Sequence, residues 1–288
     1  MIEQNVLTNA DLNMIWEAKV GAHPAIVTNV DSLLAKIASD LSDAQIDYLF
    51  QLFRTAWINE DASRRDREQL LELVRRLAED DRKGDMADRV LDVLWQMTTA
   101  INVSEEILND TLHNIVKILD FGSLTDRERR RTSWLKRIVT ELKNQPKNDV
   151  SNTIPVIKLF EQIGNLFPET IHDEYNNAPT VGTTFDRKVV LSRLEQDEGL
   201  IRHVSEELIE YRKDNKISSS YGSLVEIQLR LQFIKYILTE AQIYLNLEHA
   251  VRIWEELVLH ARYWKHITFL EIRHLNMTLN MTPYVALI

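Results

Sequence analysis

The stretch SDAQIDYLFQLFRTAWINEDASRRDREQLLELVRRLAEDDRKGDMADRVLDVLW, residues 42–95, decides the fold class. Apolar residues recur in it at intervals of three and four, which is the period of an amphipathic α-helix. Ser42 and Gln45 form a capping-box pair at the start of the first helix, and Gly84 stands where a glycine ends a helix. The stretch therefore predicts three successive helices joined by short polar links.

The composition extends this prediction to the rest of the chain. Its 288 residues include only 7 Gly and 6 Pro, and no proline stands between Pro24 and Pro146. More than a hundred residues thus lack a strong helix breaker, whereas a β-rich or doubly wound fold needs many more turn residues. The fold class is all-α.

Helix start signals follow the same pattern on both sides of the stretch. Thr8, with Asp11 three positions later, predicts a helix that runs to about Glu17. Pro24 suits the first turn of a second helix. Toward the C-terminus, further starts are marked by Ser104, by the capping-box pair Thr125 and Glu128, and by Pro155.

The helix after Pro24 has an apolar stripe that we expect to face the core. Its members recur at helical spacing and are Ile26, Val30, Leu33, Leu34 and Ile37. Such stripes appear in each predicted helix, which implies that each helix is buried along one face against its neighbours.

The rhythm of the helices predicts an armadillo- or HEAT-like helical-repeat solenoid, an α-α superhelix. Predicted helices of about 13 to 18 residues alternate with short links, so neighbours run antiparallel and each pair buries its stripe only against the next pair. Trp57, Trp95 and Trp134 recur at spacings of 38 and 39 residues, near the ~40-residue unit of such repeats.

The chain divides into four parts on pattern alone. We expect a helical-repeat region at 1–167, a loop or linker at 168–185, a continuing helical region at 186–263 with a joint at Gly199, and a divergent tail at 264–288. The linker sequence PETIHDEYNNAPTVGTTF contains two prolines, a glycine and paired asparagines, which favour loops.

Charge and cysteine content exclude several classes of function. A net charge of −10 disfavours a nucleic-acid partner, because acidic chains repel phosphate backbones. The absence of cysteine excludes disulfides, thiolate zinc sites and a cysteine nucleophile within these residues. The N-terminus lacks the features of a secretory signal, and no apolar stretch approaches the ~20 residues of a membrane span. We therefore expect a cytoplasmic chain without membrane insertion.

Two charged clusters are candidate sites. The acidic run Glu79, Asp80 and Asp81 could hold a cation, but a solvated helix end is the favoured interpretation. The segment DRERRRTSWLKR, residues 126–137, could be a docking patch for an acidic partner. A solvated helical face balanced by neighbouring acids is favoured there too. The cations of this basic cluster are Arg127, Arg129, Arg130, Arg131, Lys136 and Arg137.

Other motifs give no support to chemistry. His260, His266 and His274 lack the spacing of a helical zinc motif, and Asn276 and Asn280 head formal glycosylation sequons that need a secretory route. No nucleophile-elbow or phosphate-loop motif is present. We therefore assign no catalytic, cofactor-binding or metal-ligating residue, expect no cofactor, and leave the partner-binding residues unassigned.

The run LLELVRRLAEDDRKGDMADRVLDVLW, residues 70–95, closely resembles a segment in the non-catalytic N-terminal half of the fat-facets-type ubiquitin-specific proteases. LTNADLNMIW, AIVTNVDSLLAKIASDLS and KILDFGS resemble that region in the same order, and the likeness runs from about Leu7 to about Trp254. It is weakest at 168–185, and the sequence after about His260 departs from the family.

The resemblance implies an armadillo-like scaffold that docks ubiquitinated substrates or adaptors for a cysteine deubiquitinase. The family's catalytic Cys and His boxes belong to a separate downstream domain, and nothing in this chain matches them. The chain is therefore expected to be a fragment or a short form. The alternatives are a stand-alone helical-repeat adaptor unconnected with ubiquitin and, with least support, an enzyme built from dispersed acid–base residues.

Overall fold

The computed structural model describes residues 7–59, 61–79, 81, 85–100, 103–120, 124–145, 154–167, 187–214, 221–243 and 247–255. These residues form twelve α-helices, and within the described ranges there is no strand. They divide into two compact units: residues 1–134 with 145–155, and residues 135–144 with 156–288. The predicted linker at 168–185 and the predicted tail at 264–288 lie outside the described residues.

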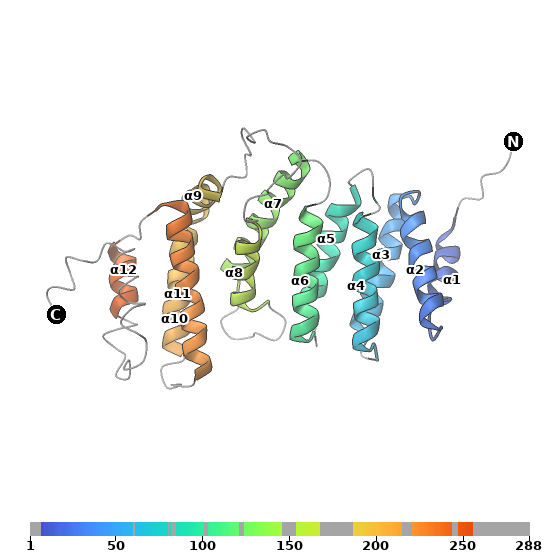
Figure 1. Cartoon of the computed structure of the whole chain (residues 1–288), viewed down its shortest axis with the longest axis horizontal. Helices are drawn as coiled ribbons and strands as arrows, with labels where there is room; N and C mark the ends of the chain where they lie inside the picture. Colours follow the sequence, from blue (N-terminus) through green and yellow to red (C-terminus); the bar gives the residue numbers. More distant parts are fainter. Residues whose placement is uncertain are drawn as a thin grey trace, which may run out of the picture. The chain divides into compact units, whose positions relative to one another are not determined.

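The first unit contains six whole helices and the beginning of a seventh, which continues into the second unit. Their bounds are α1 Asn9–Glu17, α2 Pro24–Ala38, α3 Asp43–Ile58, α4 Arg64–Glu79, α5 Asp85–Thr98, α6 Glu105–Leu119 and α7 Leu124–Lys143. The chain alternates between two layers, with α2, α4 and α6 in one and α1, α3 and α5 in the other (Figure 1).

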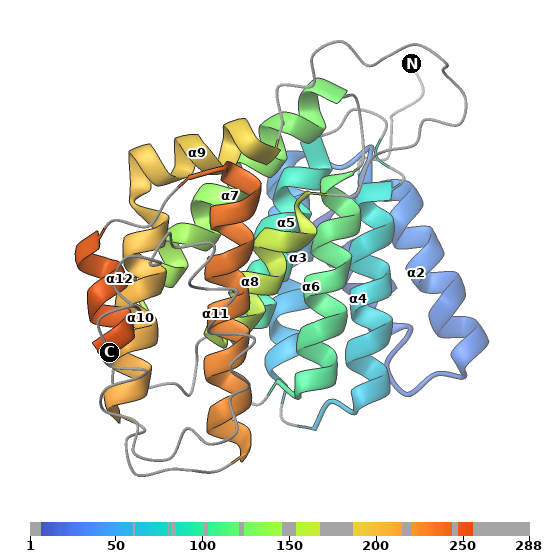
Figure 2. The same ribbon diagram turned by 60° about the vertical axis from the view of Figure 1, so that its left-hand side comes forward.

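Helices of the first unit pack both on neighbours in the chain, as in α3·α4, α4·α5 and α5·α6, and on helices two places along the chain. The contacts α2·α4 and α4·α6 build one layer, and α1·α3 and α3·α5 build the other. Figure 2 shows α2, α4 and α6 side by side. Stacking of successive helix pairs in two layers is the architecture of helical repeats, so the predicted fold class is confirmed.

The spaced tryptophans are buried at equivalent places in successive repeats. Trp57, Trp95 and Trp134 are 2%, 6% and 4% exposed and stand on α3, α5 and α7. The indole N–H of Trp57 donates to the carbonyl of Met97 on α5 at 3.1 Å. The rings of Trp95 and Trp134 meet edge to face, with centroids 5.2 Å apart. Trp57 and Trp95 therefore each join their own repeat to the next.

Polar pairs also join successive repeats, at a recurring separation of 42 residues. Asp47 of α3 accepts from Arg89 of α5 at 3.1 Å, and Asp88 of α5 accepts from Arg130 of α7 at 3.1 Å. The Asp47–Arg89 pair is solvent-accessible, and such pairs contribute only about 0–1 kcal/mol each, so it specifies the register between repeats more than it stabilises the fold. Arg130, in contrast, is only 3% exposed, so its pair with Asp88 is part of the packed interior.

The predicted cap at Thr8 and the predicted capping box at Ser42 are confirmed, and the first of these is also a capping box. At the first, the amide of Thr8 donates to Asp11 at 2.8 Å and the amide of Asp11 donates back to the Thr8 hydroxyl at 3.2 Å. At the second, the amide of Ser42 donates to Gln45 at 2.8 Å. The third prediction is wrong: α7 already begins one residue before Thr125, so Thr125 lies inside the helix and cannot cap it.

The predicted stripe of α2 is only partly buried. Leu34 is fully buried, whereas Ile26 and Leu33 remain 48% and 46% exposed. The buried face of α2 is shifted around the helix and includes the small residues Ala35 and Ala38. Small side chains let α2 approach its neighbours closely, and the larger aliphatic side chains are left on the outer side.

The second unit contains the end of α7 together with α8 Val156–Asn165, α9 Arg187–Glu198, α10 Leu200–Asp214, α11 Tyr221–Ala241 and α12 Leu247–Trp254. Here α11 packs on α8, α9 and α10, and α12 packs on α10. Phe160 of α8 and Phe233 of α11 stack with centroids 4.1 Å apart. The unit is thus built around α11.

A buried guanidinium network links α10 to α11. Arg230 is only 4% exposed and donates to Glu207 at 2.9 Å and to Glu226 at 2.6 Å. Its guanidinium carbon lies 3.9 Å from the centre of the Tyr211 ring. Burial raises the pKa of Glu207, against the lowering effect of the hydrogen bond from Arg230.

The predicted joint between α9 and α10 is confirmed at Gly199, whose φ of +61° favours glycine. Glu195 spans this joint, because its carboxylate accepts from the amide of Ile201 at 2.6 Å. That contact satisfies one of the free N–H groups at the start of α10. Burial raises the pKa of Glu195 above its ordinary value of 4.5.

Glu195→Gln is expected to reduce the dependence of stability on pH. A raised pKa means that the folded state binds the proton more tightly than the unfolded state, so stability falls as pH rises through the window above 4.5. Glutamine keeps an oxygen for the Ile201 amide but has no charge to desolvate. Urea unfolding between pH 4.5 and 7 should show a shallower decline in the free energy of unfolding. Asp197→Asn, on the exposed side of the same helix, is the control, and an unchanged slope in Glu195→Gln would contradict the assignment.

Candidate partner-binding groove

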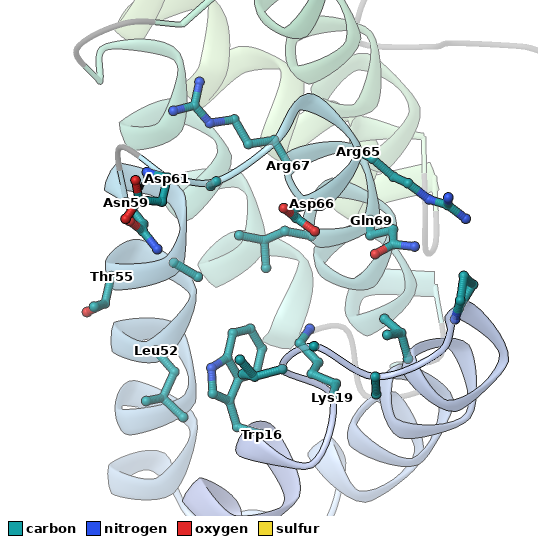
Figure 3. A pocket seen from close by; sticks show the side chains of 18 residues that line it. Trp16, Lys19, Leu52, Thr55, Asn59, Asp61, Arg65, Asp66, Arg67 and Gln69 are labelled. Atoms are coloured by element: carbon teal, nitrogen blue, oxygen red, sulfur yellow. Dashed lines mark hydrogen bonds between the residues drawn. The ribbon is translucent and has the colours of Figure 1, made fainter.

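A groove of about 770 Å³ opens in the first unit, between the α1–α2 turn, the end of α3 and the start of α4 (Figure 3). Its size is within the range of ligand-binding clefts. The apolar side chains that line it include Trp16, Val20, Val27, Leu52, Ala56 and Leu70.

Two turns hold the walls of the groove in place. Gly21, with a φ of +69°, lets the chain reverse between α1 and α2. After α3, the side chain of Asn59 accepts from the amide of Asp61 at 3.1 Å, which bends the chain toward α4. The start of α4 is fixed because the amide of Ser63 donates to Asp66 at 2.9 Å. The groove is therefore formed before any ligand arrives.

Trp16 stands in the wall of the groove, held from two sides. Its ring lies 5.4 Å from the ring of Phe53, and the ammonium of Lys19 lies 3.8 Å from its centroid. Lys19 also pairs with Asp31 at 2.9 Å, and both side chains are largely buried. The charge of Lys19 is thus neutralised within the fold, and the lysine serves to position the indole.

A second hollow of about 280 Å³ lies between α2 and α4 and continues the groove. Arg65 and Gln69 of α4 line both hollows. The far end of the second hollow is closed by Glu72 and Arg76, which pair with each other at 2.9 Å. The combined groove follows the N-terminal half of α4.

One cation of the groove remains available to a ligand. Lys19 is paired with Asp31 and Arg76 with Glu72, whereas within the described part of the chain Arg65 makes no ion pair. Figure 3 shows Arg65 and Gln69 on α4, across the groove from Thr55 and Asn59 at the end of α3. Beside its apolar side chains the groove is lined by amides, by the guanidinium groups of Arg65 and Arg67 and by the carboxylates of Asp61 and Asp66. Such a lining suits binding more than proton transfer or nucleophilic attack.

The acidic run predicted to be a solvated helix end has structural roles. Glu79 pairs with Arg75 one turn earlier, and Asp81 accepts from the amide of Met86 at 2.7 Å at the start of α5. Asp80 lies outside the described residues. Among the residues that the structure describes, no three His, Asp or Glu side chains are grouped so that they could hold a metal ion.

The basic cluster at 126–137 is largely used inside the fold. Arg129 pairs with Asp88 at 2.7 Å and Arg130 pairs with the same carboxylate at 3.1 Å. Arg131 is buried and pairs with Asp120. Neighbouring acids balance these cations as predicted, but the prediction of a solvated face is wrong for Arg130 and Arg131, which are 3% and 7% exposed. These contacts leave little of the cluster for a partner.

The C-terminal histidines and the sequons belong to the part of the chain that is not described. His260, His266, His274, Asn276 and Asn280 all lie outside the described residues. Among the described helices, none combines the length and the apolar character that crossing a bilayer requires.

The groove residues carry no motif that sequence reasoning singled out. One signal could have found Trp16: it precedes Trp57 by 41 residues, close to the spacing between the later tryptophans. It is therefore an earlier member of the same tryptophan series, and its indole is half-exposed.

Comparison with known proteins gives matches over nearly the whole chain. The family model described as "UBP24/USP9X/USP9Y ARM repeat" matches residues 1–269. "Ubiquitin carboxyl-terminal hydrolase 9X" of Mus musculus is 36% identical over 280 residues, which are 91% of this chain and 11% of that protein. "Probable ubiquitin carboxyl-terminal hydrolase FAF" of Drosophila melanogaster is 34% identical over 276 residues, 91% of this chain and 10% of that protein.

A more distant match has the same extent. "Ubiquitin carboxyl-terminal hydrolase 24" of Homo sapiens is 21% identical over 280 residues, 86% of this chain and 10% of that protein. The chain thus spans about a tenth of the length of these curated relatives.

Proposed function

Because the chain belongs to the ARM-repeat family of UBP24, USP9X and USP9Y, we propose that it is a non-catalytic scaffold and substrate-docking segment of a large cysteine deubiquitinase. The observation that carries the proposal is the match of 91% of the chain to a ubiquitin carboxyl-terminal hydrolase. The chain corresponds to the repeat region and not to a catalytic domain. It contains no cysteine, so it has no thiol nucleophile of its own.

The mechanism is binding followed by chemistry elsewhere in the polypeptide. A substrate or adaptor held on the repeats has a raised effective concentration at a protease domain tethered to them. The rate at which ubiquitin is removed from that substrate increases without any new catalytic contact. A small ubiquitin reporter does not use the docking surface, so the rate of its hydrolysis does not depend on that surface.

The groove beside Trp16 is the surface that we assign to docking. Its occupant is an extended segment of a protein partner that carries a carboxylate. The carboxylate pairs with Arg65, which makes no ion pair within the described part of the fold, and aliphatic side chains lie on Trp16 and Leu52. The amides of Asn59 and Gln69 lie beside the path of such a segment and can bond to its backbone.

The first experiment is to measure the size of the native polypeptide by immunoblot with an antibody against this chain. A band of several hundred kilodaltons supports a segment of a large deubiquitinase. A single band at the 33.7 kDa of this chain would instead support a stand-alone adaptor. Robust turnover of a ubiquitin–amide reporter by the purified chain would contradict the non-catalytic assignment.

Arg65→Glu in the native polypeptide is expected to slow removal of ubiquitin from a docked protein substrate about tenfold. A charge-assisted hydrogen bond contributes about 1.5–3 kcal/mol, and ~1.4 kcal/mol is a factor of ten. Hydrolysis of a ubiquitin–amide reporter should not change. Arg193→Glu is the control, because Arg193 is exposed and lies outside the groove. An equal loss on both substrates, or no loss on either, would rule out docking through Arg65.

A further inference from the structure

The outer side of α2 is unusually apolar for a surface. Ile26 and Leu33 are 48% and 46% exposed, and Val30 and Ile37, at helical spacing from them, are half-buried. These residues form one stripe, which is typical of a face that packs on another helix. The only exposed charge on α2 is Lys36, although 27% of the chain is charged.

The equivalent positions of the next repeat are fully buried. The layer of α2 continues in α4, and a shift of 40 residues carries Val30, Leu33 and Ile37 onto α4. The residues at those positions are Leu70, Leu73 and Leu77, which are 4%, 0% and 2% exposed. A further shift of 41 residues carries Leu70 and Leu77 onto Thr111 and Ile118 of α6, and both of these residues are 0% exposed.

The reason for this burial is that α2 covers that face of α4. Leu70 lines the groove together with Val27 of α2, and Leu73 lines the second hollow, whose opposite wall is α2. The same face of α2 therefore points to the place that an earlier helix of the layer takes in a stacked array. Within the described part of the chain, no helix covers it.

We propose that the outer face of α2 is a repeat–repeat interface, covered by a further helical repeat of the same polypeptide. That repeat lies on α2 as α2 lies on α4. The inference rests on the proposed function, because it requires a polypeptide longer than these 288 residues. It adds that the array extends beyond α1 and that this end is not a terminus of the scaffold.

The composition and direction of the face disfavour both a capping repeat and a second copy of the chain. A terminal repeat that ends an array has a polar outer side, whereas the stripe of this face is formed by Ile26, Val30, Leu33 and Ile37, with Asn29 and Lys36 as its exposed polar neighbours. A second copy related by a two-fold axis would place α2 against α2 in antiparallel orientation. Helices two apart in a chain of antiparallel neighbours, such as α2 and α4, run parallel. The stripe of α2 is equivalent to a parallel-stacked face, so a helix from the preceding repeat is the occupant.

The test is hydroxyl-radical footprinting of the native polypeptide and of the isolated 288-residue chain, read by mass spectrometry. Oxidation at Ile26 and Leu33 is expected to be about fivefold lower in the native polypeptide, as Leu33 changes from 46% exposed toward the burial of Leu73. Ile58, which is 66% exposed on α3, is the internal control and should be oxidised equally in both samples.

Each outcome decides between the proposals. Protection in a longer native polypeptide supports the interface. A longer polypeptide without protection overturns the interface and leaves the docking function intact. A native polypeptide of 33.7 kDa overturns both. Protection in the isolated chain that rises with its concentration would assign the face to a second copy and overturn the inference.

A pair of matched variants adds a check that does not depend on labelling. Leu33→Asp should leave the melting temperature of the isolated chain nearly unchanged but lower it in the native polypeptide. Leu73→Asp, at the equivalent buried position, should lower it in both. Equal tolerance of Leu33→Asp in both samples would contradict the interface.

Discussion

Replacement of Trp95 by alanine is expected to lower the free energy of unfolding of the first unit by about 3–5 kcal/mol, the usual range for a buried tryptophan. Trp95 is 6% exposed, and its ring meets the ring of Trp134 edge to face at 5.2 Å. The change leaves a cavity between two repeats and removes an aromatic pair worth about 0.5–1.5 kcal/mol beyond its buried area. Urea unfolding followed by far-ultraviolet circular dichroism measures the effect without relying on tryptophan fluorescence.

Trp16→Ala is the matched control for this prediction. It changes the same residue type at an earlier position of the tryptophan series, where the side chain is half-exposed and one side faces the groove. Less buried area is lost there, so the decrease in stability should be clearly smaller than for Trp95. Equal losses at the two positions would show that the tryptophans do not stabilise the array by joining one repeat to the next.

Arg230→Met is expected to destabilise the second unit by about 3–5 kcal/mol, as is typical when one member of a buried ion pair is removed. Methionine can fill much of the space but leaves Glu207 buried without the guanidinium that donates to it at 2.9 Å. The pKa of Glu207 is already raised by burial, and loss of Arg230 should raise it further. The damage should therefore grow as pH rises above the ordinary glutamate value of 4.5.

A double-mutant cycle isolates the pair. In a Glu207→Gln background, Arg230→Met should destabilise much less, because no buried carboxylate is left without its partner. Urea unfolding of the four proteins at pH 7 gives the coupling free energy. If the cost of Arg230→Met is the same in both backgrounds, the network acts through packing on Tyr211 and not through charge.

The sequence was sufficient to predict the features of this fold that depend on local pattern. The capping pairs at Thr8 and Ser42, the joint at Gly199 and the spacing of the tryptophans each follow from a few neighbouring residues. Together they predicted stacked helix pairs. The resemblance carried by residues 70–95 pointed to the family that the comparisons then showed.

Features that depend on distant residues were not predictable in this way. The sequence of α2 does not indicate that part of its apolar stripe faces outward. The exposure of that part depends on which helices lie beside α2. Arg130 resembled a member of a solvated basic face, yet its partner Asp88 lies 42 residues earlier. The groove depends on two turns, at Gly21 and Asn59, which bring α1, α3 and α4 together from different repeats.

The short reach of the contacts between repeats also bears on how the chain is made. The pairs that join one repeat to the next link residues about one repeat apart, for example 40 positions for Trp57 and Met97 and 46 for Asp43 and Arg89. A contact order this low favours rapid folding. Each repeat can therefore pack on the previous one as soon as some forty further residues leave the ribosome. Synthesis and folding of the first unit can then proceed together, one repeat at a time.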